Sequence, residues 1–207
     1  MHMTEDAKRI IDDSIRAVLP DAAVYRALEG RRFDRPVTVI AIGKAAWAMA
    51  NAAWDTLSTR ITSGAVITKY GHSRGPIGPL QIFEAGHPVP DEAGLRAAQA
   101  ALELTRGLRE EDCVLFLISG GGSALFESPL VPLAELEDIT GQLLSCGADI
   151  VEINTIRKRL SAVKGGRFAL HCRPAPVFSV VLSDILGDPL DTVSYTHLRA
   201  HETPEHL

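Results

Sequence analysis

The sequence predicts an α/β fold in which a mainly parallel sheet carries helices on both faces. Short apolar segments rich in β-branched residues alternate with helical segments of roughly ten to fifteen residues, the pattern of strands joined by crossover helices. Two of these apolar segments run directly into glycine turns, as strands do where a sheet presents a site at its carboxyl edge. The composition agrees, since 46% hydrophobic and 23% charged residues over 207 residues are ordinary globular usage. Disordered, collagen-like and disulfide-framed classes are therefore excluded.

The first predicted element is an amphipathic helix that Thr4 can cap and that ends at Pro20. Its apolar positions keep the three-and-four spacing expected of one buried face. They are Ala7, Ile10, Ile11, Ile15, Val18 and Leu19. A second short helix is predicted over residues 22–28, before Gly30.

The next segments predict the first strands of the sheet. Val37–Ile42 is almost wholly apolar, as in a strand covered on both faces, and Gly43 separates it from a helix over residues 44–57. Residues 64–68 form a second candidate strand. Residues 80–83 form a weaker third, whose direction stays open and which could be an antiparallel edge.

The second half repeats the alternation. Asp91 can cap a helix that runs to about residue 106, and residues 113–118 form the most apolar strand of the chain. Helices are predicted over residues 133–145 and 148–163. A last strand, Val177–Leu182, then ends in Ser183 and Asp184. The whole order is that of a Rossmann-like three-layer domain.

The strongest candidate site is the glycine loop formed by Ser119, Gly120, Gly121, Gly122 and Ser123. Three consecutive glycines are costly in any regular element, so the bare backbone implies close approach of another group. Backbone N–H groups at the start of a following helix, with the serine hydroxyls, would hold a phosphate. The loop is neither a P-loop nor a G-x-G-x-x-G fingerprint, and a tight turn without a ligand is the alternative.

Lys44 is the second candidate. It lies at the start of a predicted helix, where the helix dipole favours negative charge, so an anionic ligand there would remove the conflict. The alternative is a lysine that extends into solvent.

Further polar groups lie near predicted element ends. Asn154 and Lys158 are four residues apart on one helix face, although cations near a helix end are also expected without a ligand. Asp184 follows a buried strand, where a Mg²⁺ ligand or a general base would lie, or a turn aspartate. His87, before a proline, is more often structural.

Five motifs together resemble a known family. They are AIGKAA at 41–46, GHPVPD at 86–91, SGGGSA at 119–124, NTIRK with KGG within 154–166, and SD with GD within 183–188. In this order they are similar to the amino-terminal domain of class II glycerate 2-kinases, from Ile10 to about Val193. Those enzymes phosphorylate D-glycerate to 2-phosphoglycerate with ATP and Mg²⁺, and some relatives carry the label hydroxypyruvate reductase.

The resemblance implies roles for individual residues. Lys44 would be a catalytic or substrate-positioning lysine, and residues 119–123 would cradle phosphate of the nucleotide. Asn154 and Lys158 would bind substrate in the same cleft, and Asp184 would act in catalysis and as a metal ligand.

Two departures from the family pattern are expected to matter. Such kinases are about twice this length, so we expect their second, smaller domain to be absent and the chain to be a fragment that is inactive alone. The predicted domain covers residues 4–193, and residues 194–207 look like a non-native tail of adapter read-through. A metal site formed by His197, His201 and His206 is the weaker alternative for that stretch.

The net charge and the lengths of the apolar segments exclude some kinds of binding partner. The net charge of −5 supplies no basic field for nucleic acid, and no apolar run approaches the roughly 18 residues of a membrane span. Cys113, Cys146 and Cys172 show no metal or redox pairing and are expected to be buried in a reducing, cytoplasmic setting. The partner is therefore a small molecule. Two functional alternatives stay open, a phosphometabolite-binding module and hydroxypyruvate reductase, and the oligomeric state is undetermined.

Overall fold

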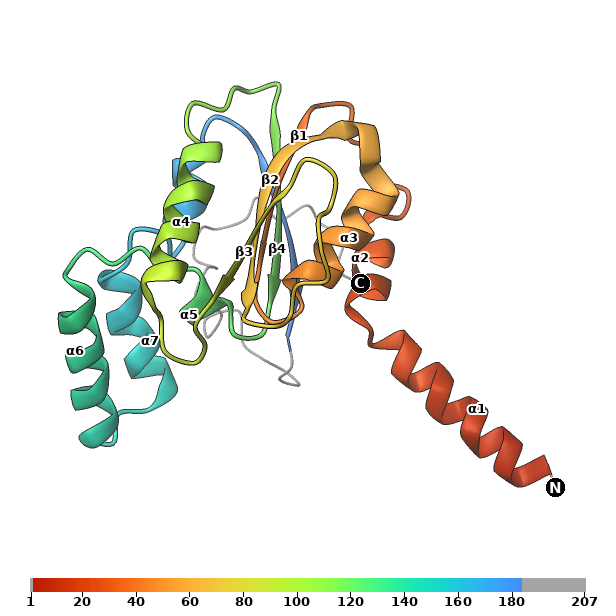
Figure 1. The fold of residues 1–207 in the computed structure, drawn as a ribbon, viewed down its shortest axis with the longest axis horizontal. Coiled ribbons are helices and arrows are strands. Elements are labelled where there is room, and N and C mark those ends of the chain that lie inside the picture. The colour runs from red at the N-terminus through yellow and green to blue at the C-terminus, as the bar shows by residue number, and fades with distance from the viewer. Residues whose placement is uncertain (1, 184–207) are drawn as a thin grey trace.

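The computed structural model describes residues 2–183 and shows one five-stranded sheet within that range (Figure 1). The strands are β1 (Val37–Ile42), β2 (Ile61–Lys69), β3 (Gln81–Ala85), β4 (Cys113–Ser119) and β5 (Val177–Leu182). Their order is β3-β2-β1-β4-β5, and all four pairings are parallel. The predicted parallel sheet is thus confirmed, and the edge strand β3, whose direction the sequence left open, is parallel.

Helices cover both faces of the sheet, as predicted. Strand β1 shows how, because its successive side chains point to opposite faces. Val39 and Ala41 pack with α2 (Pro20–Leu28) and α3 (Ala46–Leu57), whereas Ile40 and Ile42 face the opposite core. That second core includes side chains from α4 (Glu92–Leu104), α5 (Gly122–Leu125) and α8 (Arg167–His171).

Several element boundaries follow from local chemistry. Asp91 caps α4 by accepting a hydrogen bond from the Gly94 N–H at 2.9 Å, as predicted. Helix α6 (Leu133–Ser145) has the predicted bounds, and α7 (Ile150–Arg159) is shorter than the predicted 148–163. The short helices α5 and α8 and the 3-10 turn η1 (Ser58–Arg60) were not predicted.

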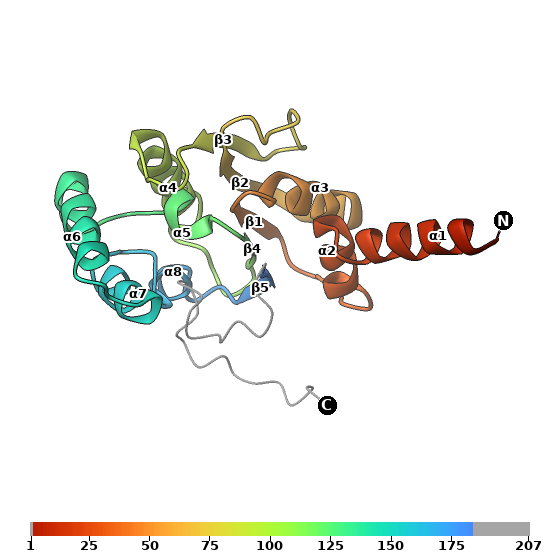
Figure 2. The same cartoon turned by 90° about the horizontal axis from the view of Figure 1, so that it is seen from below.

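Helices α6 and α7 lie at one end of the molecule, beyond α5 and α8 (Figure 2). Two backbone hydrogen bonds join the chain entering this pair to the chain leaving it. The Leu130 N–H donates to the Leu160 carbonyl, and the Ala162 N–H donates to the Ser128 carbonyl, both at 2.8 Å. Because Leu160 and Ala162 form these hydrogen bonds with residues 128–130, helix α7 ends at Arg159, before the predicted end at residue 163.

Helix α1 (His2–Ala17) extends from the opposite end of the molecule (Figure 1). Thr4 lies inside this helix, which begins at His2, so the predicted cap is wrong. The predicted buried face is also wrong in the described structure, where Ile10 is 65% exposed and Val18 is 70% exposed. The periodicity gave the helix and its apolar stripe, but periodicity does not say which surface covers that stripe.

The cysteines divide into two classes. Cys113 and Cys172 are buried and Cys146 is exposed, so the expectation of burial is wrong for Cys146, which follows the last turn of α6. None of the helices among residues 2–183 is long and apolar enough to cross a membrane.

Candidate functional site

The candidate site lies where the order of the sheet reverses. Strand β1 pairs with β2 on one side and with β4 on the other, and the helices that follow β1 and β4 cover opposite faces. In open parallel sheets, the carboxyl edge at such a reversal is the usual position of a ligand site. The Gly43 turn after β1 and the 119–123 loop after β4 both lie at this edge.

The two turns contact each other directly. The Lys44 N–H donates to the Gly120 carbonyl at 2.8 Å, and the Ala45 N–H donates to Ser119 Oγ at 3.1 Å. Ser119 Oγ in turn donates to the Ile42 carbonyl at 3.1 Å. The hydroxyl proton of Ser119 is therefore used in a hydrogen bond within the protein. The sequence suggested that this hydroxyl donates to phosphate, whereas in the structure it joins the two turns.

Gly121 contacts the side chains of two residues from other elements, His87 and Lys44. Its φ of +86° is a conformation that favours glycine, and it caps the four-residue helix α5. A β-carbon at Gly121 would lie 2.8 Å from His87 Nε2 and 3.4 Å from Lys44 Cγ. The space that a side chain would fill at Gly121 is thus occupied by His87 and Lys44, so glycine lets these two side chains lie directly against the loop.

His87 lies beside the glycine loop, a position that the sequence interpretation did not give it. The GHPVPD motif contained the signal, but a single histidine before proline does not by itself indicate where the imidazole lies. Burial lowers its pKa below the ordinary 6.5, and the charges of Lys44, Lys69 and His72 lower that pKa further. His72 belongs to the same edge, since its Nδ1 lies 3.0 Å from the Lys44 carbonyl oxygen.

Helix α7 brings the other candidate residues to this side of the sheet. Asn154 is buried, at 8% exposure, and Lys158 is half-buried. Helix α7 contacts the glycine loop through Arg157, whose Nη2 donates to the Ser123 carbonyl at 3.2 Å. That Asn154 and Lys158 line the same cleft as the loop and bind substrate stays a prediction.

Asp184, the predicted catalytic and metal residue, lies outside the described residues. Strand β5 pairs with β4 so that Leu182 is opposite Ser119, which brings the end of β5 to the same carboxyl edge. Within residues 2–183 no group of three or more His, Cys, Asp or Glu side chains is placed to hold a metal ion.

Comparison with known proteins identifies the family. A family model described as a domain of unknown function, DUF4147, matches residues 6–202. The chain belongs to the DUF4147 family.

The DUF4147 chain resembles the amino-terminal part of glycerate 2-kinases, as the motifs implied. It is 54% identical over 190 residues to D-glycerate 2-kinase of Thermotoga maritima, across 91% of this chain and 45% of the relative. A crystal structure of glycerate kinase from the same organism superposes with a TM-score of 0.87 and 51% identity, over 93% of this chain and 47% of that chain. A protein of Agrobacterium vitis, provisionally named hydroxypyruvate reductase, is 42% identical over 186 residues, across 87% of this chain and 41% of its own length. The DUF4147 chain thus spans about half the length of these relatives.

Proposed function

We propose that this chain supplies the amino-terminal half of a glycerate 2-kinase site, which transfers a phosphoryl group from ATP to D-glycerate and forms 2-phosphoglycerate. The observation that carries the proposal is the contact at the sheet reversal, where Lys44 and His87 lie against the bare backbone of Gly121. A cation beside a glycine loop at the carboxyl edge of a parallel sheet is an arrangement suited to an anionic, phosphorylated ligand.

The glycine loop would hold phosphate of the nucleotide through its backbone. Gly121 lets the Lys44 and His87 side chains lie against the main chain of the loop, and the loop precedes the N-terminal turn of α5. In this arrangement Ser119 acts by fixing the Gly43 turn against the loop, through its bonds to Ile42 and Ala45. Gly120 and Ser123 would be the other residues of the loop that bind the phosphate.

Lys44 would act on the phosphoryl group in transfer. Its side chain is exposed at the carboxyl edge, and a lysine ammonium acts as a point charge toward phosphate oxygens. Phosphoryl transfer depends on positioning and electrostatic stabilisation more than on covalent catalysis. We therefore expect Lys44 to lower the barrier more than it improves binding.

Asn154 and Lys158 would bind the substrate, with Lys158 paired to the glycerate carboxylate. Asp184 would act in catalysis and ligate Mg²⁺, which supplies charge neutralisation of the phosphates when bound. The 45% coverage of the Thermotoga relative leaves room for further groups from the other part of such enzymes.

The experiment is a coupled ADP-release assay on a hybrid protein. The hybrid joins this chain to the carboxyl-terminal part of the Thermotoga maritima D-glycerate 2-kinase, and the chain alone is assayed beside it. We expect ADP release that requires D-glycerate in the hybrid and negligible release by the chain alone. A folded hybrid that releases no ADP with D-glycerate would contradict the proposal.

The name of the Agrobacterium relative makes hydroxypyruvate reduction the second candidate. The same hybrid can be incubated with hydroxypyruvate and NADH, and NADH oxidation followed by absorbance. The turn after β1 lacks the G-x-G-x-x-G pattern of dinucleotide sites, so we expect no oxidation above the protein-free rate. Turnover of NADH would favour the reductase instead.

A further inference from the structure

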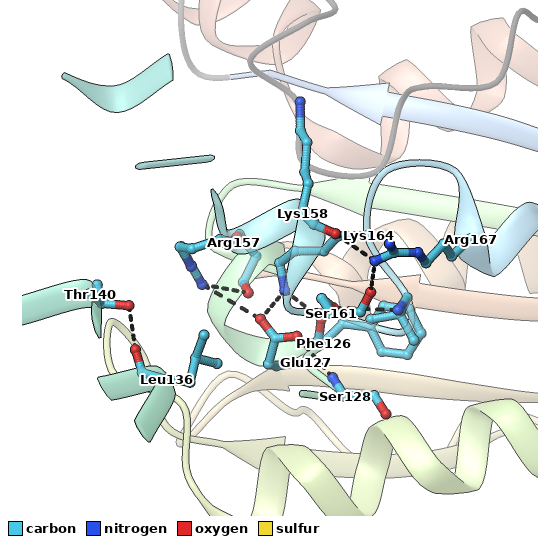
Figure 3. A network of polar contacts seen from close by, with 12 residues as sticks. Phe126, Glu127, Ser128, Leu136, Thr140, Arg157, Lys158, Ser161, Lys164 and Arg167 are labelled. Carbon is cyan, nitrogen blue, oxygen red and sulfur yellow. Dashed lines mark hydrogen bonds and ion pairs between the residues drawn. The ribbon is translucent and has the colours of Figure 1, made fainter. Parts of the chain in front are cut away.

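A buried charge cluster contacts the last residue of the glycine loop through Arg157, and its side chains are shown in Figure 3. It consists of Glu127, Lys164 and Arg157, whose side chains are 1%, 0% and 17% exposed. The proposed phosphate contacts do not use any of these three side chains. Charged groups are seldom buried this deeply unless they are paired, so the cluster calls for an explanation.

Glu127 is the centre of this cluster. Its Oε2 forms an ion pair with Lys164 Nζ and lies 3.8 Å from Arg157 Nη2. Its Oε1 accepts a hydrogen bond from the Ser128 N–H at 3.1 Å. Lys164 Nζ also donates to the Phe126 carbonyl at 3.4 Å, so the chain on both sides of Glu127 is held in the cluster.

Arg157 connects the cluster to the loop. The same Nη2 that faces Glu127 donates to the Ser123 carbonyl at 3.2 Å. Because Arg157 belongs to α7, this guanidinium joins the last residue of the glycine loop to the helix that carries Asn154 and Lys158.

A second arginine holds the same carboxyl-terminal end of α7. Arg167 Nη1 donates to the carbonyls of Lys158 at 2.6 Å and of Arg159 at 3.3 Å, and it also bonds to the Ser161 carbonyl. Figure 3 shows the Lys158 side chain pointing away from the Glu127 cluster. The last turn of α7 is therefore held both by the Arg157 side chain and by Arg167, while the Lys158 side chain extends in another direction.

We propose that Glu127 is a positioning residue, whose carboxylate holds Arg157 and Lys164 so that the glycine loop and helix α7 keep one fixed relative placement. The proposal rests on the proposed function, because it assigns phosphate to the loop and substrate to α7. A buried ion pair is often no more stabilising than well-packed apolar side chains, so a geometric role explains the cluster better than stability does.

The test must separate positioning from folding. Glu127→Gln alone leaves Lys164 and Arg157 facing a neutral side chain and lowers stability, so it cannot decide between the two roles. The double variant Glu127→Gln with Lys164→Met removes both charges of the central pair together. Arg157→Lys keeps the charge and removes Nη2, the atom that contacts both Ser123 and Glu127. Arg159→Lys, on the exposed side of the same helix, is the control.

The first readout uses the chain itself and needs no ligand. Amide hydrogen exchange is measured at Ala124, Leu125 and Phe126, whose N–H groups donate to the Gly121 and Gly122 carbonyls. We expect exchange at least tenfold faster than wild type in the double variant and in Arg157→Lys, with exchange in α4 and in Arg159→Lys unchanged. Wild-type exchange at these three amides in both test variants would overturn the proposal.

The second readout uses the kinase hybrid, with the Michaelis constants for ATP and D-glycerate and the turnover number measured at a temperature where every variant is folded. We expect the double variant and Arg157→Lys to raise a Michaelis constant or lower turnover at least fivefold, even where urea unfolding shows near-wild-type stability. If the Michaelis constants and the turnover number are wild-type in every variant whose urea-unfolding stability is wild-type, the role of Glu127 is structural only, and the proposal is overturned. A hybrid without kinase activity contradicts the proposed function, and the exchange experiment then still decides whether Glu127 positions the loop.

Discussion

Gly43 and Ser119 lie so close that a β-carbon on Gly43 would be 2.3 Å from Ser119 Oγ and 2.4 Å from the Ser119 carbonyl oxygen. The contact joins the ends of β1 and β4 at the place where the sheet order reverses. It explains the glycine after β1 independently of any ligand, and it places the Lys44 turn against the glycine loop. The geometry of the candidate site therefore depends on the absence of a side chain at position 43.

Gly43→Ala is predicted to destabilise the fold strongly. The φ of +111° at Gly43 is unfavourable for alanine, and the obstructing atoms include backbone, which cannot rotate away. We expect a loss of about 3 kcal/mol or more in the free energy of unfolding, measured with urea. Gly30→Ala is the control, because Gly30 has φ +69° with open space around it and should lose only about 1–2 kcal/mol. Equal losses in the two variants would contradict the close contact.

Gly121→Ala is predicted to impair binding more than stability. Its β-carbon would meet the His87 ring and Lys44, which are side chains and can move, so the fold survives while the site changes. We expect the Michaelis constant of the hybrid for ATP to rise about tenfold, equivalent to about 1.4 kcal/mol. Gly107→Ala, at φ +70° with nothing nearby, should show a similar stability loss and unchanged kinetics. Unchanged kinetics in Gly121→Ala would remove Gly121 from the site.

The imidazole of His87 is predicted to titrate below pH 6.5, as measured by NMR. Burial is the main cause and the Lys44 charge is the next, so Lys44→Met should raise this pKa part of the way back. Because the folded-state pKa is depressed, the unfolded chain binds more protons in the window between that pKa and 6.5. The His87 contribution to stability is therefore complete above pH 6.5 and is lost as the pH falls through the folded pKa. A His87 pKa that does not respond to Lys44→Met would contradict their proximity.

Thiol reactivity is predicted to separate the three cysteines. Cys146 is exposed, whereas burial raises the pKa of Cys113 and raises the pKa of Cys172 to about 12. One equivalent of a thiol reagent should react rapidly at pH 8 with native protein, and Cys146→Ser should abolish this reaction. The remaining two thiols should react only after unfolding. Fast labelling of Cys172 in native protein would show that the core around α8 is open.

Most of the sheet could be predicted because strands buried on both faces leave a clear pattern. Val37–Ile42 is apolar at every position, and the bounds of β1 and β5 match the prediction. The glycine turns also indicated the correct edge of the sheet, because glycine is needed where two backbones approach closely. Lys44 became a candidate because a cation conflicts with a helix start, but α3 begins two residues later, at Ala46, and the role of Lys44 stays a prediction.

Contacts between residues far apart in the chain could not be predicted from the local sequence pattern. Glu127 lies in no periodic segment and no motif, and its burial depends on Lys164 and Arg157, which are more than 25 residues away in the sequence. His87 reaches the glycine loop only because β3 lies beside β2 and the chain then returns over the carboxyl edge. The apolar stripe of α1 gave the correct helix and the wrong environment for the same reason.

The most direct test of the account is the turnover number of the kinase hybrid with Lys44→Met, compared with Lys8→Met on the exposed helix α1. Methionine keeps the length of the side chain and removes the charge that we assign to the transferring phosphoryl group. The account predicts a fall in turnover of about 100-fold to 1,000-fold in Lys44→Met, as for loss of one electrostatic contact in a transition state, with Lys8→Met unchanged. Equal turnover in the two variants would contradict the central claim that the sheet reversal at Lys44 and the glycine loop is the phosphoryl-transfer site.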